Sequence, residues 1–241
     1  MIRSEDRLIV ALDMDRVEDA VGLVRKLTPL GVTRFKIGLN LYTLAGPAAV
    51  EAVQQAGGKV FLDLKFHDIP NTVSKAVRAA ARLGVWMTNV HVQGGSVMMQ
   101  SALAAAQEES HWNRREKPLL IGVTVLTSMA EKDLMDLGLS KTLKDQVLSL
   151  AQLAQSAGLQ GIVASAQEAK EVRSTCGQEF VIVTPGIRPK GKEEKDDQQR
   201  TATPLEAIQA GADYLVVGRP ILEAPDPVQV AGRILEECAK A

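Results

Sequence analysis

The sequence has few aromatic residues, few cysteines and no strong excess of either charge. Phe, Trp and Tyr together make up 3% of its 241 residues, so the stacking surfaces that bind single-stranded nucleic acid are not expected. The formal net charge of -1 provides no general attraction to nucleic acid or to anionic membranes. Any site for a phosphate group must therefore be a local feature of the chain.

Cysteine, histidine and long apolar runs are also scarce. The two cysteines, Cys176 and Cys238, form no C-x-x-C pair, which favours reduced thiols over a disulfide or a metal site. No run approaches the length of a membrane span, and the first residues, MIRSEDRLIVALD, are charged where a secretion signal is apolar. We therefore expect a cytoplasmic protein. No metal is expected either, because no ligand spacing is seen among the three histidines, His67, His91 and His111.

Short β-branched runs alternate with longer helical segments along the whole sequence. Parallel strands need crossover helices, and eight regular units in 241 residues favour a closed (β/α)₈ barrel, the TIM barrel of the α/β class, over an open doubly wound sheet. No Pro-, Gly- or Ser-rich linker interrupts the pattern, so residues 1–241 are expected to form a single domain. The predicted strands are 8–12, 33–37, 59–64, 86–92, 119–126, 161–164, 180–184 and 214–217.

One polar segment, RPKGKEEKDDQQRT at residues 188–201, departs from this alternation. It is too hydrophilic to belong to a core, and a solvated surface loop is its simplest interpretation. However, it follows the seventh predicted strand, and active sites of such barrels form at the carboxyl ends of the strands. We therefore interpret residues 187–202 as a lid over a phosphate-binding site.

The densest group of ionisable residues is DLKFHD at residues 63–68. Residues two apart in a strand face the same side, so Asp63 and Lys65 should both point into the barrel, with Asp68 just beyond them. Lys36 ends the second predicted strand and Asp13 follows the first. A structural ion pair, with Asp68 as a helix N-cap, would explain part of this pattern. Because buried charges are costly unless paired, five converging residues favour an active site.

The carboxylates around Lys65 indicate the chemistry of this lysine. They favour its charged ammonium form, whereas a Schiff-base lysine must be neutral. Lys65 is therefore predicted to donate a proton, which suits a reaction that forms a carbanion, such as a decarboxylation. Neighbouring carboxylates would also repel a substrate carboxylate, and this repulsion ends when carbon dioxide leaves.

A second signal predicts a phosphorylated substrate. The last two predicted strands are followed by TPGIR, which ends at Arg188, and by VGRP, which contains Gly218 and Arg219. Glycine lets the backbone approach a ligand closely, and arginine can bind two phosphate oxygens at once. The loops after strands seven and eight commonly hold phosphate in these barrels.

The run DLKFHDIPNT at residues 63–72 resembles the signature segment of the orotidine 5′-phosphate decarboxylase family. The resemblance extends through VALDM, FKIG, NVHVQGG, VTVLTS, TPGIRP and DYLVVGRP, over nearly the whole chain. It implies a (β/α)₈ barrel that acts as a homodimer with shared active sites and without a cofactor or metal. It also implies the decarboxylation of orotidine 5′-monophosphate to uridine 5′-monophosphate in de novo pyrimidine biosynthesis.

The resemblance also implies roles for the charged residues. Lys65 matches the lysine that protonates C6 of the pyrimidine, and Asp63 matches the acid near the departing carboxylate. Asp68 would complete the charge network from the partner subunit. Lys36 and Asp13 resemble residues that contact the ribose, with Lys36 linked to the charge network.

The remaining site residues come from the same resemblance. The lid glutamine matches Gln198 when counted back from Thr203, whereas the usual count from the arginine gives Asp197, and Gln199 is a possible substitute. Ile69 and Thr72 would lie in the partner's contribution, and Thr127 beside the pyrimidine. The other expected substrate contacts are Leu64, Phe66, His67, Pro70, Asn71, Arg188, Gly218 and Arg219.

Two other functions remain as alternatives. A magnesium-dependent phosphosugar decarboxylase of the keto-gulonate 6-phosphate type shares a D-x-K-x-x-D core, but the acid that it needs on the second strand is replaced here by Lys36. A non-catalytic barrel that binds a phosphorylated metabolite would explain the Gly-Arg loops and would leave the Asp/Lys group unexplained.

Overall fold

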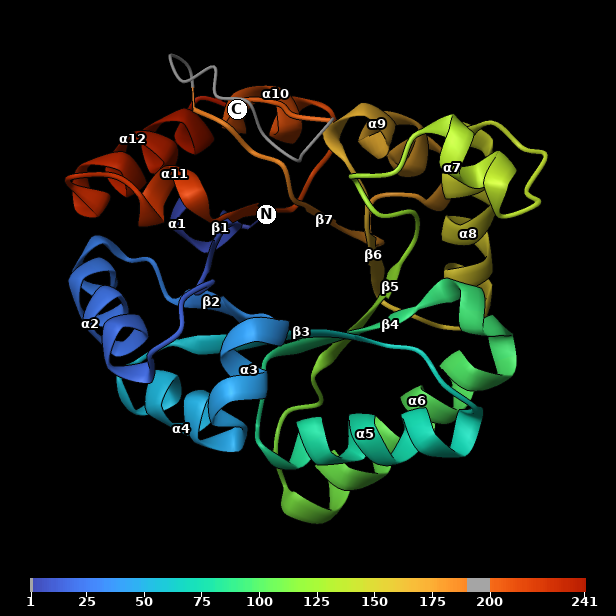
Figure 1. Cartoon of the computed structure of the whole chain (residues 1–241), viewed down its shortest axis with the longest axis horizontal. Helices are drawn as coiled ribbons and strands as arrows, with labels where there is room; N and C mark the ends of the chain where they lie inside the picture. The colour runs from blue at the N-terminus through green and yellow to red at the C-terminus, as the bar shows by residue number, and fades with distance from the viewer. Residues whose placement is uncertain (1, 190–199) are drawn as a thin grey trace.

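The β-branched runs form eight parallel strands whose side chains are mostly buried. In the computed structural model, which describes residues 2–189 and 200–241, neighbouring strands pair in chain order, and β8 pairs with β1 to close the sheet. The prediction of a (β/α)₈ barrel is therefore confirmed (Figure 1). The strands are β1 (Leu8–Ala11), β2 (Arg34–Ile37), β3 (Lys59–Phe66), β4 (Met87–His91), β5 (Leu119–Val123), β6 (Gly161–Val163), β7 (Val181–Thr184) and β8 (Tyr214–Val217).

Amphipathic helices surround the strands and bury their apolar faces against them (Figure 1). Between β1 and β2, for example, the helix buries Ala20, Leu23, Val24 and Leu27, which recur at helical spacing. The helices are α1 (Ser4–Arg7), α2 (Val17–Leu27), α3 (Leu39–Ala45), α4 (Pro47–Gln55), α5 (Pro70–Arg82), α6 (Gly95–Asn113), α7 (Glu131–Asp136), α8 (Leu143–Ser156), α9 (Ala166–Cys176), α10 (Pro204–Gln209), α11 (Arg219–Leu222) and α12 (Pro227–Ala239), with 3₁₀ turns η1 (Thr28–Leu30) and η2 (Val92–Gly94).

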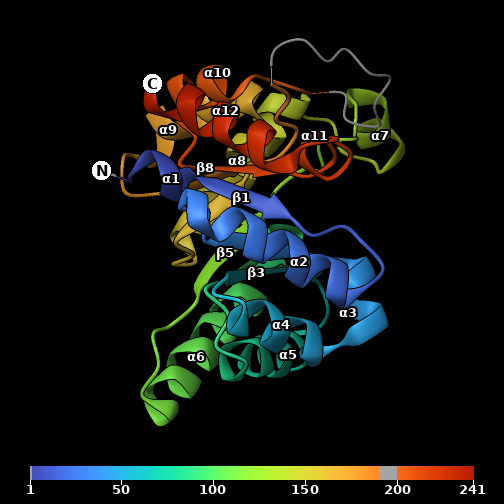
Figure 2. The ribbon, with the colours of Figure 1, turned by 90° about the vertical axis from the view of Figure 1, so that its left-hand side faces the viewer.

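The two ends of the barrel differ. At the amino end, α1 contacts β1 and β8, and the Arg34 guanidinium pairs with Asp6 and lies over the rings of both Trp86 and Tyr214. Figure 2 shows α3, α7 and α11 on the opposite side, toward which β1 points. An apolar layer inside the barrel, which includes Phe61, separates the two ends. In the described part of the chain, α1 and the Arg34–Asp6 pair cover the amino end, so a site that reaches into the barrel is expected at the carboxyl end.

Two strands differ from their predicted limits by two residues or more at one end, and the others by at most one residue at either end. β3 continues to Phe66, two residues beyond its predicted end, although its register with β4 shifts between Leu62 and Phe66. β5 ends at Val123 and not at residue 126. There the Thr124 hydroxyl donates to the Val163 carbonyl at 2.8 Å, and the chain turns into the barrel mouth.

Two expectations about the whole chain concern membranes and thiols. Across residues 2–189 and 200–241, none of the helices combines the length and the apolar character that a membrane crossing requires. Cys176 and Cys238 are both buried and unpaired. Burial raises the pKa of both thiols, that of Cys238 to about 11.

Candidate active site

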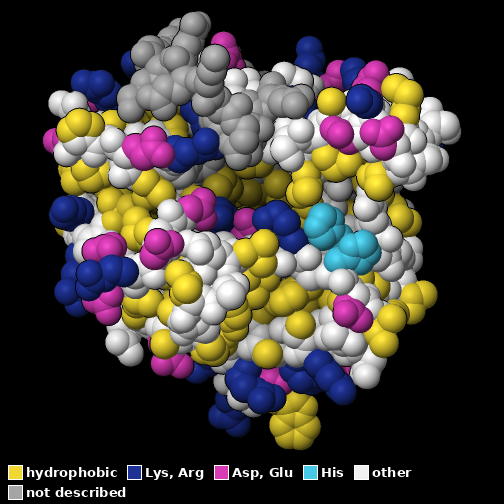
Figure 3. Space-filling model, in the orientation of Figure 1, with side chains coloured by type: hydrophobic (Ala, Val, Ile, Leu, Met, Phe, Trp, Pro, Cys, Tyr) yellow, Lys and Arg dark blue, Asp and Glu magenta, His cyan; other side chains and the backbone are white. Residues whose placement is uncertain are grey.

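A cavity of about 290 Å³ opens at the carboxyl end of the barrel. Valine side chains from β5, β6, β7 and β8 form much of its wall, while charged residues lie in β2 and β3 and follow β1, β7 and β8. Figure 3 shows acidic and basic side chains gathered at the centre of this face beside hydrophobic ones. The cavity therefore combines an apolar lining with a few charged groups, which is typical of small-molecule sites.

Four charged side chains form a continuous chain of contacts along one wall of the cavity. Lys36 Nζ donates to Asp13 Oδ1 at 3.0 Å and lies 3.5 Å from Asp63 Oδ2. Lys65 Nζ donates to Asp63 Oδ1 at 2.8 Å. The structure thus brings together four of the five charged residues that the sequence singled out, in the order Asp13, Lys36, Asp63, Lys65. We call these four residues the mouth cluster.

Burial and charge act in opposite directions on Asp63, which is 8% exposed. Burial raises the pKa of this carboxyl, but the neighbouring Lys36 and Lys65 ammonium groups and the Asn89 amide lower it further than burial raises it. The net pKa lies below the usual range of an aspartate. Asp63 therefore remains ionised at neutral pH and can repel an anionic group brought against it.

Position 38, in the FKIG segment, has no room for a side chain. A Cβ atom on Gly38 would lie 2.9 Å from Lys36 Nζ and 3.1 Å from Asp13 Oδ1. Both distances are shorter than ordinary van der Waals contacts, so a side chain at this position would displace the ion pair. Gly38 leaves the space that the Lys36–Asp13 contact occupies.

Lys65 has a backbone conformation that simple strand alternation does not predict. Its φ is +51°, in the left-handed region that L-residues other than glycine seldom adopt. The change lies within the register shift between β3 and β4. The Lys65 N–H donates to Asn89 Oδ1 at 2.8 Å, and Asn89 Nδ2 donates to Asp63 Oδ1 at 2.7 Å. Asn89 was missed by the sequence reasoning, although an asparagine, a residue type depleted in strands, inside the predicted strand 86–92 was a signal.

The cavity wall at β7 and β8 carries the predicted phosphate loops. Gly186 and Arg188 follow β7, and Gly218 and Arg219 follow β8, and all four line the cavity. The Arg188 N–H donates to the Ala202 carbonyl at 2.9 Å, which holds the two ends of the segment after β7 together. Cationic side chains and glycine backbone therefore line the part of the cavity at β7 and β8, where Gly218 lies next to Asp13 of the mouth cluster.

Comparison with known proteins agrees with this arrangement. Residues 6–234 match the family described as orotidine 5′-phosphate decarboxylase / HUMPS. The chain belongs to this family.

Individual proteins named orotidine 5′-phosphate decarboxylase are similar to nearly the whole chain. The orotidine 5′-phosphate decarboxylase of Moorella thermoacetica is 51% identical over 240 residues, which cover 98% of this chain and 94% of that protein. The enzyme of the same name from Vibrio vulnificus is 52% identical over 226 residues, 94% of this chain and 95% of that protein. The solved structure of orotidine 5′-phosphate decarboxylase from Lactobacillus acidophilus matches with a TM-score of 0.85 at 37% identity, over 97% of this chain and 99% of that one. Given this similarity over nearly full lengths, the protein is an enzyme of the carboxy-lyase class.

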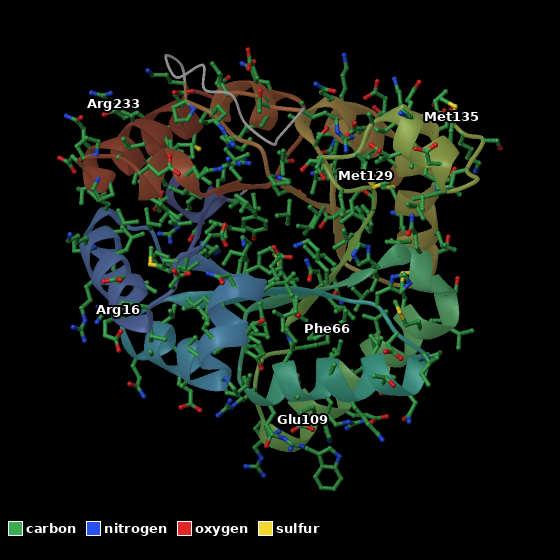
Figure 4. All side chains as sticks on the ribbon, in the orientation of Figure 1. Arg16, Phe66, Glu109, Met129, Met135 and Arg233 are labelled. Atoms are coloured by element: carbon green, nitrogen blue, oxygen red, sulfur yellow. The ribbon has the colours of Figure 1, made fainter. Side chains whose placement is uncertain are left out.

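Several residues expected at the site lie outside the cavity. Leu64 and Phe66 pack against the apolar clusters outside the barrel, and Figure 4 shows Phe66 between β3 and α5. Ile69 is 67% exposed, and its N–H donates to Asp68 Oδ1 at 2.7 Å. The N-cap of α5 is Ile69 itself, without a side-chain cap, so helix capping does not explain Asp68. Pro70, Asn71 and Thr72 begin α5.

The remaining predicted residues fall into three groups. Thr127 lines the cavity and is 9% exposed. His67 is exposed, and its ring centroid lies 5.3 Å from that of His91. Figure 3 shows histidine side chains next to basic ones at the centre of this face. Burial, then the charges of His67 and Lys65, lower the pKa of His91. Gln198 lies outside the described residues, as do Asp197 and Gln199.

A buried ion pair beside the cavity was also missed by the sequence reasoning. Arg200 Nη1 lies 2.6 Å from Glu168 Oε1, and the two residues are 7% and 3% exposed. Arg200 Nη2 also donates to the Leu126 carbonyl at 2.9 Å, next to Thr127. Glu168 Oε2 accepts the Ser165 N–H at 3.1 Å, as part of a capping box at the start of α9. The S-x-x-E spacing of that box was a usable signal for Glu168, whereas nothing local indicated Arg200.

A metal site would need several donor groups facing one point. Within the described parts of the chain, no three His, Cys, Asp or Glu side chains gather in this way. In the mouth cluster, the space between the Asp13 and Asp63 carboxylates is occupied by the Lys36 ammonium, at 3.0 Å and 3.5 Å from them.

Proposed function

We propose that this protein converts orotidine 5′-monophosphate to uridine 5′-monophosphate and carbon dioxide, as a step of de novo pyrimidine biosynthesis, with Lys65 as the proton donor. The observation that carries this proposal is the position of Lys65 Nζ, 2.8 Å from Asp63 Oδ1 at the wall of the cavity. The relatives at about half identity bear the name of this activity. No cofactor or metal has a role in the proposed reaction.

In this mechanism the bond between C6 of the pyrimidine and its carboxylate breaks, and the electron pair stays on C6. Lys65 Nζ delivers a proton to that carbon, and the resulting neutral amine takes a proton back from solvent. The ammonium also stabilises the developing negative charge before the proton moves. Lys36 and Asp63 support this role because they surround the lysine with fixed charges of both signs.

Asp63 acts on the group that leaves. Its low pKa keeps it ionised, so a substrate carboxylate placed beside it is repelled. This repulsion disappears when the carboxylate departs as neutral carbon dioxide.

The remaining contacts hold the substrate by its ends. Asp13 and Lys36 bind the ribose, and Thr127 lies beside the pyrimidine. Arg188, Gly218 and Arg219 bind the phosphate, because arginine and glycine backbone from the loops after β7 and β8 line that wall. Gln198, within a lid at residues 187–202, is assigned from the sequence alone.

The active form is proposed to be a homodimer in which Asp68, Ile69 and Thr72 complete the partner's site. Two observations support this proposal: Asp68 lies outside its own cavity, and exposed apolar side chains follow the ends of the adjacent strands β2, β3 and β4. Exposed apolar side chains that gather on one face mark an interaction site more often than scattered ones do. The exposed members of this group are Leu39, Leu44, Ile69 and Val97.

Subunit mixing tests the shared site. Lys65→Ala and Asp68→Ala proteins should each be nearly inactive, and their mixture should regain activity after subunit exchange, because each heterodimer contains one intact site. A mixture of Lys65→Ala with Asp63→Ala is the matched control. Both residues belong to the same subunit's site, so each site of the heterodimer lacks one of them and the mixture should stay inactive. If the Lys65→Ala and Asp68→Ala mixture does not regain activity after subunit exchange, Asp68 does not act in the partner's site.

The two alternatives are less well supported. A magnesium-dependent phosphosugar reaction needs carboxylates free to bind the ion, whereas Asp13 and Asp63 already flank the Lys36 ammonium. A non-catalytic binding protein has no use for a lysine held against a buried carboxylate. A cytoplasmic location is part of the proposal, because unpaired buried cysteines are usual in a reducing compartment.

The change in ultraviolet absorbance on mixing chelator-treated protein with orotidine 5′-monophosphate tests the whole proposal. We expect conversion to uridine 5′-monophosphate by the wild type and its loss in Lys65→Ala. No conversion by a folded, dimeric wild type would overturn the proposal. The next substrates to test would then be phosphosugars with magnesium.

A further inference from the structure

Asn89 lies in the middle of β4, where its side chain is fully buried. Its amide makes two hydrogen bonds to β3: Oδ1 accepts from the Lys65 N–H at 2.8 Å, and Nδ2 donates to Asp63 Oδ1 at 2.7 Å. Asn89 does not line the cavity. One side chain on β4 therefore contacts the backbone of the proposed proton donor and the carboxylate of its partner.

The hydrogen bond from the Lys65 N–H to Asn89 Oδ1 takes the place of a backbone hydrogen bond between β3 and β4. β3 and β4 pair at Leu62 with Thr88 and again at Phe66 with Val90, and the register shifts between these pairs. Lys65 lies within the shift, with a φ of +51° that is unfavourable for a residue with a Cβ atom. Asn89 Oδ1 provides an acceptor for its N–H in this conformation. Such strained residues persist only where their surroundings hold them.

The second bond fixes the orientation of a carboxylate. Asp63 Oδ1 accepts both Asn89 Nδ2 and Lys65 Nζ, while Oδ2 faces Lys36 Nζ at 3.5 Å. Without the amide donor, the carboxylate could rotate about its last torsion and change both lysine contacts. A buried amide with both of its polar atoms occupied therefore defines the positions of two charged groups at once.

We infer that Asn89 is a positioning residue for the reaction, an inference that rests on the proposed function. By holding the Lys65 backbone and the Asp63 carboxylate together, it directs Lys65 Nζ to the place where the proton is delivered. It does not line the cavity, so we expect it to act on the rate of the chemical step and not on binding. Small misplacements of a catalytic group reduce rates by as much as about 10²-fold.

Asn89→Ala tests the inference against a matched control, Thr88→Val. Thr88 is also fully buried in β4, and its hydroxyl also donates to β3, at the Leu62 carbonyl at 2.9 Å, but it contacts neither Asp63 nor Lys65. We expect kcat of Asn89→Ala to fall by about 30-fold or more, with KM within about threefold of wild type. We expect Thr88→Val to keep kcat within about threefold.

Asn89→Asp provides a nearly isosteric second variant. It retains an acceptor for the Lys65 N–H but removes the donor to Asp63 and places a second carboxylate beside it, so we expect kcat to fall at least as far as in Asn89→Ala. If Asn89→Ala does not fold, this variant decides the question alone.

The outcomes separate the two proposals. A wild type without decarboxylase activity would overturn the proposed function. An active wild type with kcat unchanged in the folded Asn89 variants would overturn only the role of Asn89. A fall in kcat equal in Asn89→Ala and Thr88→Val would also overturn it, because loss of any buried bond between β3 and β4 would then suffice.

Discussion

Two groups of charged side chains lie near the carboxyl end of this barrel, and they are built differently. In the Glu168–Arg200 pair, Glu168 Oε1 faces Arg200 and Oε2 faces the Ser165 N–H and hydroxyl. Both side chains are less than 10% exposed. The mouth cluster instead lines a cavity, and the side chains of Asp13 and Lys65 at its two ends are 53% and 31% exposed.

This difference separates charges that stabilise the fold from charges that act on a ligand. In the pair, the carboxylate oxygens of Glu168 and the terminal nitrogens of Arg200 are occupied by protein groups, which leaves little capacity for a substrate, and breaking the pair leaves an uncompensated charge. A cluster that opens into a cavity can interact with a substrate as well as with itself. We therefore expect substitutions in the mouth cluster to reduce activity more than stability, and substitutions in the pair to do the reverse.

Lys65→Ala should produce the largest effect. Removal of the proton donor is expected to lower kcat/KM by about 10³-fold or more, because positioned acids and bases contribute about 10²–10⁴-fold. Lys65 is partly exposed and its backbone partner Asn89 remains, so the unfolding free energy should change by about 1 kcal/mol or less. Steady-state kinetics and denaturant unfolding of the same preparation measure both. A variant that keeps a tenth of the wild-type activity would remove Lys65 from the mechanism.

Arg200→Met should show the opposite pattern. It leaves the Glu168 carboxylate buried without its cation, and we expect the unfolding free energy to fall by about 3 kcal/mol or more. Glu168→Leu combined with Arg200→Met should recover most of that loss, because apolar replacements of whole buried pairs are often neutral. Denaturant titration measures both changes.

An exposed ion pair on α9, the helix that carries Glu168, serves as the control for Arg200→Met. Glu171 of α9 contacts Lys144 at the surface, and Glu171→Gln should lower the unfolding free energy by less than about 1 kcal/mol. Equal losses in Arg200→Met and Glu171→Gln would contradict the contrast between buried and exposed pairs.

The contribution of Asp63 to stability should depend on pH. Because the folded-state pKa of this carboxyl lies below its usual value, its ionised form stabilises the folded protein above about pH 4, the usual range of an aspartate. That stabilisation is lost as the pH falls through the lowered pKa. The difference in unfolding free energy between wild type and Asp63→Asn should therefore be larger at pH 6 than at pH 3. A difference that does not change with pH would show that the lysines do not stabilise the charged form of Asp63.

The parts of this structure that the sequence predicted depend on local patterns. Alternation of strands and helices identified the barrel, because each pattern is complete within about ten residues. The mouth cluster followed from it, since the carboxyl ends of parallel strands meet at one end of a barrel. Asp13, Lys36 and Asp63 could therefore be brought together without knowledge of any contact between them.

The parts that the sequence did not predict depend on register and on distant pairing. The bond between Asn89 and Lys65 joins residues 24 apart and exists only because the β3–β4 register shifts. Glu168 and Arg200 are 32 residues apart, and neither carries a periodic signal that selects the other. Asp68 poses a different difficulty, because the proposed role of its carboxylate lies in a second subunit.

Gly38→Ala should produce the smallest of these effects on activity. The added Cβ would lie 2.9 Å from Lys36 Nζ and 3.1 Å from Asp13 Oδ1, so the lysine must move away from the aspartate. The lysine end is flexible and the φ of Gly38 is -94°, so we expect only about a tenfold fall in kcat/KM, with little loss of stability. Gly22→Ala in α2 is the matched control, because a Cβ there meets nothing within 4 Å and should stabilise the helix by about 0.5–1 kcal/mol. Full activity in Gly38→Ala would mean that the Lys36–Asp13 contact can shift without consequence, and that the mouth cluster depends on Asp63 and Lys65 alone.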